Sequence, residues 1–376
     1  MRPGERGVAL PIALFALVVI GALVAGTFFT GRLDQRSGAN TAFAEQAGAA
    51  AEAGLEATIA GWQPATFNAL AADQDLVLAP VSIGGGVTYQ ATLTRLNGQV
   101  FLVRSEGRRL AADGTLLARR HVGLIARLTA PPFDPPAGLA ILGALNLGGS
   151  AAISGIDQVP GGWSARCGGA GPDAAGIASN VNGVNATGSC AGLGCVTGSP
   201  KLQVTPALDT TALYVLGGVS VAALAAQASK VMTGTVTLTP RLAGGTCDVV
   251  VAGNWGEPWA GGGLAPCFDF FPVIHAPGNL RLGGGRGQGL LLVDGDLELA
   301  GGVEFYGLAV VRGSLRTVGS GGSIIGAALV ANGSGGPSAV AGNATLQRST
   351  CAVRRALAGA AMALPTRERS WAQLYD

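Results

Sequence analysis

The chain has 376 residues, of which 48% are hydrophobic, 12% are charged and 62 are glycine. That length is sufficient for two or three domains with buried cores, and the apolar content excludes wholesale disorder. The net charge is +2, and the 24 cationic residues are scattered along the sequence, which argues against a nucleic-acid-binding protein. The only histidines, His121 and His275, lie far apart. We therefore expect no catalytic, cofactor-binding or metal site, and we do not expect an enzyme.

The N-terminal region contains a segment long enough to cross a membrane. Between Arg6 and Arg32 lie 25 uncharged residues, and a helix of that length extends about 37 Å, more than the bilayer core of about 30 Å. The arginines ahead of this segment favour a cytoplasmic N-terminus. The Ala-, Glu- and Gln-rich sequence up to about Ile59 is also compatible with helix. We predict a leader over 1–7 and one long transmembrane and amphipathic helix over 8–61.

The second half of this helix carries a narrow apolar stripe, and its glutamates point elsewhere. We expect this half to pack on an exported globular domain, while the first half is anchored in an inner membrane as a single-pass segment. The residues predicted for the stripe are Phe43, Ala47, Ala50, Gly54 and Ile59.

The short leader ends in Arg6-Gly7 and is followed by the run Val8-Ala-Leu-Pro-Ile-Ala-Leu-Phe-Ala-Leu-Val-Val. Two further segments, Arg36-Ser-Gly-Ala-Asn40 and Ala50-Ala-Glu-Ala-Gly-Leu-Glu56, lie later in the predicted helix. In these features, residues 5 to about 60 resemble the N-terminal region of type IV prepilins, in particular the PilX type, which has elements similar to both later segments.

This resemblance implies processing and a role in a filament. It implies that a prepilin peptidase cleaves after Gly7 and that Val8 becomes the methylated N-terminus. Major pilins carry glutamate at the fifth mature position, where this chain has Ile12. The resemblance thus implies a minor pilin-like component of a type IV pilus or related secretion filament, located at the pilus tip or cell surface. Its partners would be other pilins or pseudopilins, contacted through the N-terminal helix.

Strand patterns begin after the helix. Alternating apolar residues over 87–95 and 100–105 flank the turn sequence Asn97-Gly98, and a further alternating segment ends near 129. We predict an antiparallel β domain over 62–130. The proline-rich sequence over 131–137 then predicts a stiff linker and a domain boundary.

The C-terminal half repeats itself with a period near 18 residues. Similar segments begin at Gly278, Gly295 and Gly313, and a second series begins at Gly289, Gly307 and Gly326. Short strands separated by glycine corners favour a parallel β-solenoid (β-helix) over 138–350, with Leu280, Leu297 and Leu315 in one interior column. The alternative is a β-sandwich with chance periodicity. The predicted fold class is accordingly α+β to mainly β.

One part of this region lacks the repeat. The motif of Gly143–Gly149 matches that of Gly278–Gly284, so a coil is expected near residue 138. We predict that an insertion over about 157–272, with a helix-like stretch near 210–232, interrupts the stack. Residues 351–376 are expected to form a C-terminal tail.

The six cysteines all lie in the predicted exported part, and their even number suggests disulfides. By sequence proximity we favour Cys247 with Cys267, and Cys167 with Cys190 or Cys195. A zinc site is the less favoured alternative, since only one pair is closely spaced. The full set of candidates is Cys167, Cys190, Cys195, Cys247, Cys267 and Cys351.

Three other motifs have structural explanations that we prefer. Gly283–Gly289 looks like a phosphate-binding loop but lacks the Lys-Ser/Thr pair, and it falls at an expected solenoid corner. Asp294 and Asp296 have no acidic neighbours in adjacent coils, so no sugar-cleaving or calcium site is expected. The aromatic loop Asn254–Trp259 either contacts a surface glycan or, as we favour, buries a tryptophan that closes the core.

The preferred function is thus a minor pilin-like structural component that displays a β-solenoid domain. The alternative is a membrane-anchored β-solenoid surface protein that binds or cleaves polysaccharide without joining a filament. Processing at Gly7 distinguishes the two.

Overall fold

The computed structural model describes residues 9–68, 70–259, 261, 263–366 and 371–374. The chain divides into two compact units, which we call the helix–sheet unit and the stacked unit. The helix–sheet unit comprises Met1–Gly61, Ala71–Arg127 and Pro365–Asp376, and the stacked unit comprises Trp62–Leu70 and Leu128–Leu364. These boundaries differ from the predicted ones, because residues 62–70 pack with the stacked unit and the last residues return to the helix–sheet unit.

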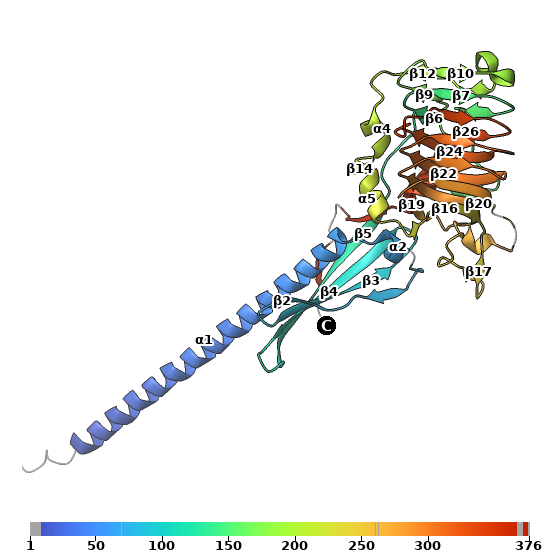
Figure 1. The fold of residues 1–376 in the computed structure, drawn as a ribbon. Coiled ribbons are helices and arrows are strands. Elements are labelled where there is room, and N and C mark those ends of the chain that lie inside the picture. Colours follow the sequence, from blue (N-terminus) through green and yellow to red (C-terminus); the bar gives the residue numbers. More distant parts are fainter. Residues whose placement is uncertain (1–8, 69, 260, 262, 367–370, 375–376) are drawn as a thin grey trace, which may run out of the picture. The chain divides into compact units, whose positions relative to one another are not determined.

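The predicted long helix is confirmed. Helix α1 runs without interruption from Ala9 to Ala60, which is 52 residues and about 78 Å (Figure 1). Its composition explains this length, since alanine, leucine and glutamate favour helix and the only proline, Pro11, lies in the first turn.

The second half of α1 packs on strands β3 and β4 of an antiparallel sheet. The buried residues follow the helical spacing i, i+3, i+4, i+7, as an amphipathic helix requires. The predicted stripe was correct at its centre, whereas Phe43 and Ile59 at its two ends are only half-buried. The buried residues of this face are Ala47, Ala50, Ala51, Gly54, Leu55 and Thr58.

The seven-stranded sheet that contains these strands has the order β1-β3-β4-β5-β27, with β2 also paired to β3 and β28 also paired to β5. One face of the sheet lies against α1. Along β3 and β4, buried side chains on this face alternate with half-buried or exposed side chains on the other face, as is common in antiparallel sheets. The strands are β1 (Asp75–Val77), β2 (Val81–Gly84), β3 (Val87–Arg95), β4 (Val100–Leu110), β5 (Leu116–Thr129), β27 (Met362–Pro365) and β28 (Trp371–Leu374).

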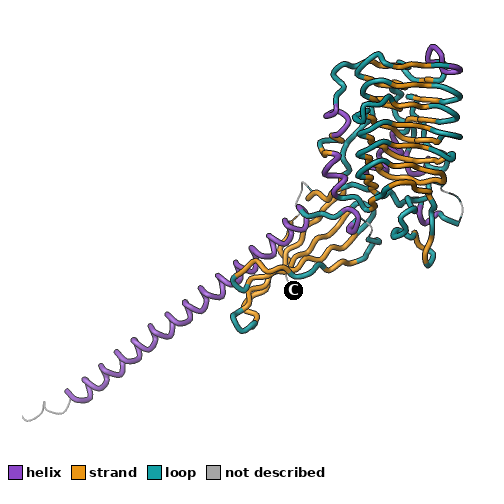
Figure 2. Tube along the Cα trace, viewed as in Figure 1, coloured by secondary structure: helices purple, strands orange, loops and turns teal. Residues whose placement is uncertain are grey.

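The stacked unit is built on a curled parallel sheet of 17 strands. Between residues 273 and 330 the chain returns to the same place after 17 to 19 residues, as the pairs Leu280–Leu297 and Leu308–Ala327 show. Figure 2 shows the strands of successive turns lying above one another, with loops at the corners. The strands are β6 (Ala137–Ile141), β7 (Leu145–Leu147), β8 (Ala152–Ser154), β9 (Ala175–Ser179), β10 (Val184–Ala186), β11 (Val196–Thr197), β12 (Leu202–Val204), β15 (Lys230–Val231), β16 (Gly234–Leu238), β19 (Val273–Ala276), β20 (Leu280–Val293), β21 (Leu297–Leu299), β22 (Val303–Val311), β23 (Leu315–Thr317), β24 (Gly322–Val330), β25 (Ser338–Val340) and β26 (Thr345–Arg348).

The order of the stack differs from the order of the chain, and this corrects the predicted insertion. Strands β9 to β12 extend the stack beyond β6–β8, and β15 and β16 extend it at the opposite end, so much of 157–272 belongs to the stack (Figure 1). The last strands of the stack, β24 to β26, pair in parallel with the first, β6 to β8. A match in local sequence could not show this order, because it depends on pairing between residues about 190 positions apart.

The segment that connects the two ends of the stack is not one helix. Gly217 and Gly218 have positive φ angles, which end a helix easily. The predicted helix-like stretch is therefore split into α4 (Thr210–Tyr214), the hairpin β13 (Val215–Leu216) and β14 (Val219–Ser220), and α5 (Val221–Ala226).

The predicted leucine column is confirmed. Leu280 pairs with Leu297 and Leu297 with Leu315, and all three side chains are buried in one apolar cluster inside the coils. The predicted glycine series also aligns: Gly307 lies between Gly289 and Gly326, with φ of +141°. A Cβ at Gly307 would overlap the carbonyl oxygen of Gly289, so only glycine fits this corner.

A second apolar cluster covers the outside of the long strands. It contains outward residues of β20, β22 and β24 and the inner face of α6 (Thr350–Ala358). The predicted C-terminal tail is thus wrong: residues 351–376 include α6, β27 (Met362–Pro365) and β28. The remaining elements are α2 (Pro64–Phe67), α3 (Ser164–Cys167), η1 (Gly188–Leu193), β17 (Leu242–Ala243), β18 (Thr246–Cys247) and η2 (Ala265–Cys267).

Candidate functional site

The first half of α1 is an exposed apolar surface. Every side chain from Leu10 to Ala42 is exposed, and this helix is long and apolar enough to cross a membrane. Ile12 is among these exposed side chains. The predicted cleavage site at Gly7 and Val8 lies outside the described residues.

The second half of α1 approaches β4 very closely. Gly107 of β4 lies under the helix, and a Cβ there would overlap the backbone oxygen of Ala47. A side-chain contact holds the same region, since Arg109 Nε donates to Gln46 Oε1 at 2.8 Å and the guanidinium lies 5.6 Å from the Phe43 ring centre. The absence of a side chain at Gly107 therefore sets the distance between helix and sheet.

We expect Gly107→Ala to loosen α1 from the sheet. The added methyl group must displace helix backbone, and overpacking of this kind costs about 1–3 kcal/mol. Hydrogen exchange of the amides in residues 47–58 would measure the effect. Gly98→Ala is the control, because Gly98 has open space around it. Equal exchange in both variants would contradict this account of the interface.

Two grooves run along the exposed flank of α1. The first, of about 890 Å³, has a floor of small residues such as Ala44 and Gly48 and is bordered by Arg36, Arg120 and Glu45. The second, of about 680 Å³, is apolar, and its lining includes Leu55, Ile59, Leu124, Pro365 and Trp371. Glu52 lines both grooves, so they form one continuous surface next to the helix.

All six candidate cysteines form disulfides. The predicted pair Cys247–Cys267 is confirmed. The preference for pairing Cys167 with Cys190 or Cys195 was wrong, since Cys190 pairs with Cys195 and Cys167 with Cys351, 184 residues away. The physical reason is that α6 folds back over the long strands and brings Cys351 to the short helix α3, which ends at Cys167.

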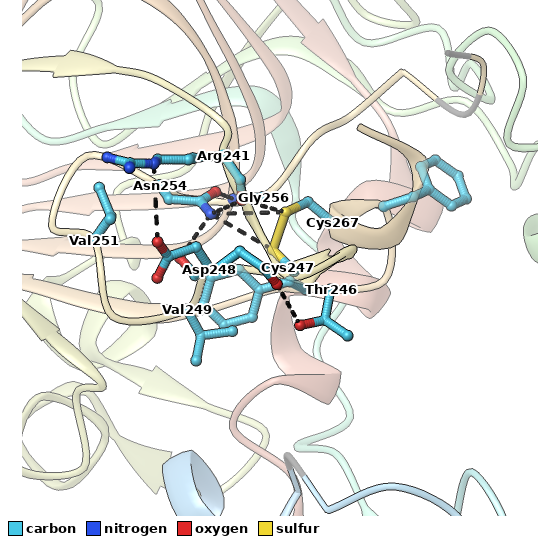
Figure 3. The surroundings of a disulfide bond; sticks show 12 residues. Arg241, Thr246, Cys247, Asp248, Val249, Val251, Asn254, Gly256 and Cys267 are labelled. Atoms are coloured by element: carbon cyan, nitrogen blue, oxygen red, sulfur yellow. Dashed lines mark hydrogen bonds and ion pairs between the residues drawn. A yellow bond between two sulfur atoms is a disulfide. The ribbon is translucent and has the colours of Figure 1, made fainter. Parts of the chain in front are cut away.

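The Cys247–Cys267 bond closes one end of the stack. Figure 3 shows Asn254 beside the bond, and its Nδ2 donates to the carbonyl oxygens of Arg241 and Asp248. The next residue, Trp255, is buried in the interior cluster.

A buried lysine fixes the same loop. Lys230 Nζ donates to the carbonyl oxygens of Val249 and Val251, at 2.9 and 2.7 Å. Burial lowers the pKa of Lys230, and the charge of Asp248 opposes this shift. The loop is therefore a rigid cap, as the exposed end of a repeat stack requires.

The other two disulfides secure the opposite end and the side of the stack. Cys190 is buried beyond β8, with Cys195 packed on the same interior cluster. Cys351 ties α6 down next to Arg355, whose guanidinium lies 4.4–4.5 Å from the ring centres of Trp163, Phe268 and Phe271. Burial lowers the pKa of Arg355 to about 10, although the charge of Asp269 opposes this shift.

The glycine-rich run and the Asp294–Asp296 pair, for which we preferred structural explanations, make contacts within the stacked unit. The run Gly283–Gly289 lies within β20, at a corner where Gly285 packs against the backbone of Leu238. Burial raises the pKa of Asp296, but hydrogen bonds from Ser314 and Ser334 outweigh it and hold that pKa below its usual value. Within the described residues, no group of three His, Cys, Asp or Glu side chains is placed to hold a metal ion.

The aromatic loop contains two tryptophans in opposite environments. Trp255 is buried and packs edge-on against Phe305, as the preferred prediction required of a core residue. Trp259 is 48% exposed and stacks on Arg286. Sequence reasoning treated the loop as a unit and so did not separate these two roles.

Comparisons with known proteins give little further guidance. No family model and no curated protein matches the chain. Among solved structures, the chain is similar to the competence-associated pilin ComZ from Thermus thermophilus, with 15% sequence identity over 81% of this chain and 90% of that one. The TM-score is 0.20, which is too low for this likeness to carry an argument.

Proposed function

We propose that this protein is a minor pilin-like component of a type IV pilus or related filament, with a structural and non-enzymatic role. The observation that carries the proposal is α1, a single 52-residue helix that is exposed over its first half and packed on an antiparallel sheet over its second half. The exposed half and the grooves beside α1 offer surfaces on which helices of other pilins or pseudopilins can pack. Of the residues that resemble the PilX-type region, those from Ala9 onward lie on this same helix.

The stacked unit is the part displayed by the filament. The parallel pairing of residues 280–330 at intervals of 17 to 19 residues supports its interpretation as a β-solenoid. Three disulfides suit an oxidising, exported location. In this proposal the N-terminus is cytoplasmic, α1 spans the inner membrane once, and a prepilin peptidase releases the mature chain.

Ile12 suggests where the subunit sits in a filament. A buried amine without an opposite charge is costly, and Ile12 offers no carboxylate to a neighbouring N-terminus. The simplest place for such a subunit is the tip, where no further subunit has to dock on it.

The test is the N-terminus of the full chain after co-expression with a prepilin peptidase. We expect mass spectrometry of this chain to find a mature N-terminus that begins with methylated Val8. In a separate measurement, we expect mass spectrometry of sheared filaments to find this subunit scarce relative to the major pilin. The matched controls are an inactive peptidase and the variant Gly7→Asp, both of which should leave Met1 in place.

An intact N-terminus with an active peptidase would overturn the filament proposal. It would favour the alternative of a membrane-anchored β-solenoid surface protein that binds or cleaves polysaccharide. Processing with abundance equal to that of the major pilin would instead remove the tip placement.

A further inference from the structure

Trp259 is an exposed aromatic side chain that polar contacts hold in one position. Its backbone N–H donates to Glu257 Oε1 at 3.0 Å, and Arg286 Nε donates to the same oxygen at 2.6 Å. The guanidinium carbon of Arg286 lies 4.1 Å from the Trp259 ring centre. Since Glu257 is buried, it fixes both the backbone of Trp259 and the cation stacked on its ring.

The loop below Trp259 is rigid as well. Trp163 Nε1 donates to the carbonyl oxygen of Pro258 at 2.6 Å, and the Glu257 N–H donates to that of Cys267 at 3.1 Å. Arg286 lies over one face of the Trp259 ring, and 48% of the residue is exposed. Such a ring can bind a flat apolar surface without losing side-chain entropy.

Polar groups surround this ring on the neighbouring coil. Glu304 pairs in register with Arg286, and Glu304 Oε2 lies 3.5 Å from the Tyr306 hydroxyl. Burial raises the pKa of Tyr306, the charge of Glu304 adds to this shift, and a hydrogen bond with Trp259 opposes it. The hydroxyl therefore remains protonated at neutral pH, and its proton points to Glu304.

The outward column that begins with Arg286 and Glu304 continues along the stack. Ser323 pairs with Glu304, and Thr345 pairs with Ser323, in successive coils about 4.8 Å apart. These side chains are half-buried and carry hydroxyl groups. A row of hydrogen-bonding groups thus leads away from the exposed ring.

We propose that Trp259 and this polar row form a binding site for a neutral saccharide chain. A sugar ring has an apolar C–H face, which packs on an aromatic ring, and hydroxyl groups at its edge, which hydrogen-bond to Arg286, Glu304 and Tyr306. The site contains one cation and two carboxylates, Glu257 and Glu304, so its net charge disfavours uronic acids and sulfated sugars. The proposal concerns the stacked unit alone and does not depend on assembly into a filament.

The test is binding of oligosaccharide probes to the full chain in lauryldimethylamine oxide, a detergent without a sugar headgroup. The neutral probes are cellohexaose, maltohexaose and chitohexaose, and the anionic probe is polygalacturonate, each titrated by calorimetry. We expect at least one neutral probe to bind and Trp259→Ala to weaken it about tenfold or more. Trp371→Ala is the matched control, because Trp371 is 49% exposed but lies in the helix–sheet unit.

Three results would overturn the proposal. These are no binding of any neutral probe, binding of polygalacturonate alone, and equal weakening by Trp259→Ala and Trp371→Ala. Because Trp259 is half-exposed, its replacement should leave thermal unfolding unchanged, and the conservative variant Trp259→Phe should retain most of the affinity. Since N-terminal processing is not measured here, failure of this test leaves the proposed filament role intact.

Discussion

Leu297→Asp is expected to unfold the stacked unit. Leu297 is fully buried between Leu280 and Leu315 in the interior column, with no hydrogen-bond partner for a carboxyl group in the surrounding apolar cluster. Burying an unpaired carboxylate costs several kcal/mol, against a total stability of about 5–15 kcal/mol for a domain. The expected readout is rapid proteolysis across residues 273–348 under conditions in which the wild-type chain resists cleavage.

The matched control introduces the same carboxylate on the outside of the stack. Arg316 lies in the same strand as Leu315 but faces solvent, so Arg316→Asp should change protease resistance little. If Leu297→Asp were as resistant as Arg316→Asp, the leucine column would not be an interior one.

The features that the sequence predicts correctly are those set by local composition and spacing. Helix α1 follows from an uncharged apolar run joined to an alanine-rich one, and the leucine column follows from a regular period with glycine corners. Cys247 and Cys267 pair across 20 residues within one loop, where proximity in sequence is a useful guide. Each of these features depends on residues that lie at most about 20 positions apart in the sequence.

The features that were missed depend on contacts between distant segments. Cys167 meets Cys351 only because α6 returns over the outside of the stack. The pairing of β6 with β24 places the first coil beside the last, and no local pattern specifies this. Trp255 and Trp259 are four residues apart in one loop, and only the packed coils decide which of them is buried.

Arg348 is a fully buried cation at the end of β26. Its Nη2 lies 2.7 Å from Asp134 Oδ1 and its Nη1 lies 3.5 Å from Asp157 Oδ1. Asp157 is also buried, and it accepts hydrogen bonds from Thr350 N and Oγ1. The carboxylate of Asp157 thus compensates the buried charge and also holds the start of α6.

Asp157→Asn is expected to lower stability by about 3–5 kcal/mol, because it removes the buried partner of Arg348 and leaves that buried cation with only the exposed carboxylate of Asp134. Urea unfolding of the full chain, followed by the fluorescence of the buried tryptophans, would measure the change. Arg348→Met should cost less, since Asp157 keeps its hydrogen bonds to Thr350. The double variant should be more stable than the sum of the two single effects predicts, because it removes both charges.

The variant Asp134→Asn tests whether the burial of a carboxylate, or only its contact with Arg348, determines the loss of stability. Asp134 contacts the same guanidinium as Asp157, but its side chain is 66% exposed, whereas that of Asp157 is 1% exposed. Water replaces an exposed partner at little cost, so this variant should lose no more than about 1 kcal/mol. Equal losses for Asp134→Asn and Asp157→Asn would show that the contact with Arg348, rather than the burial of the carboxylate, determines the stability of this part of the stack.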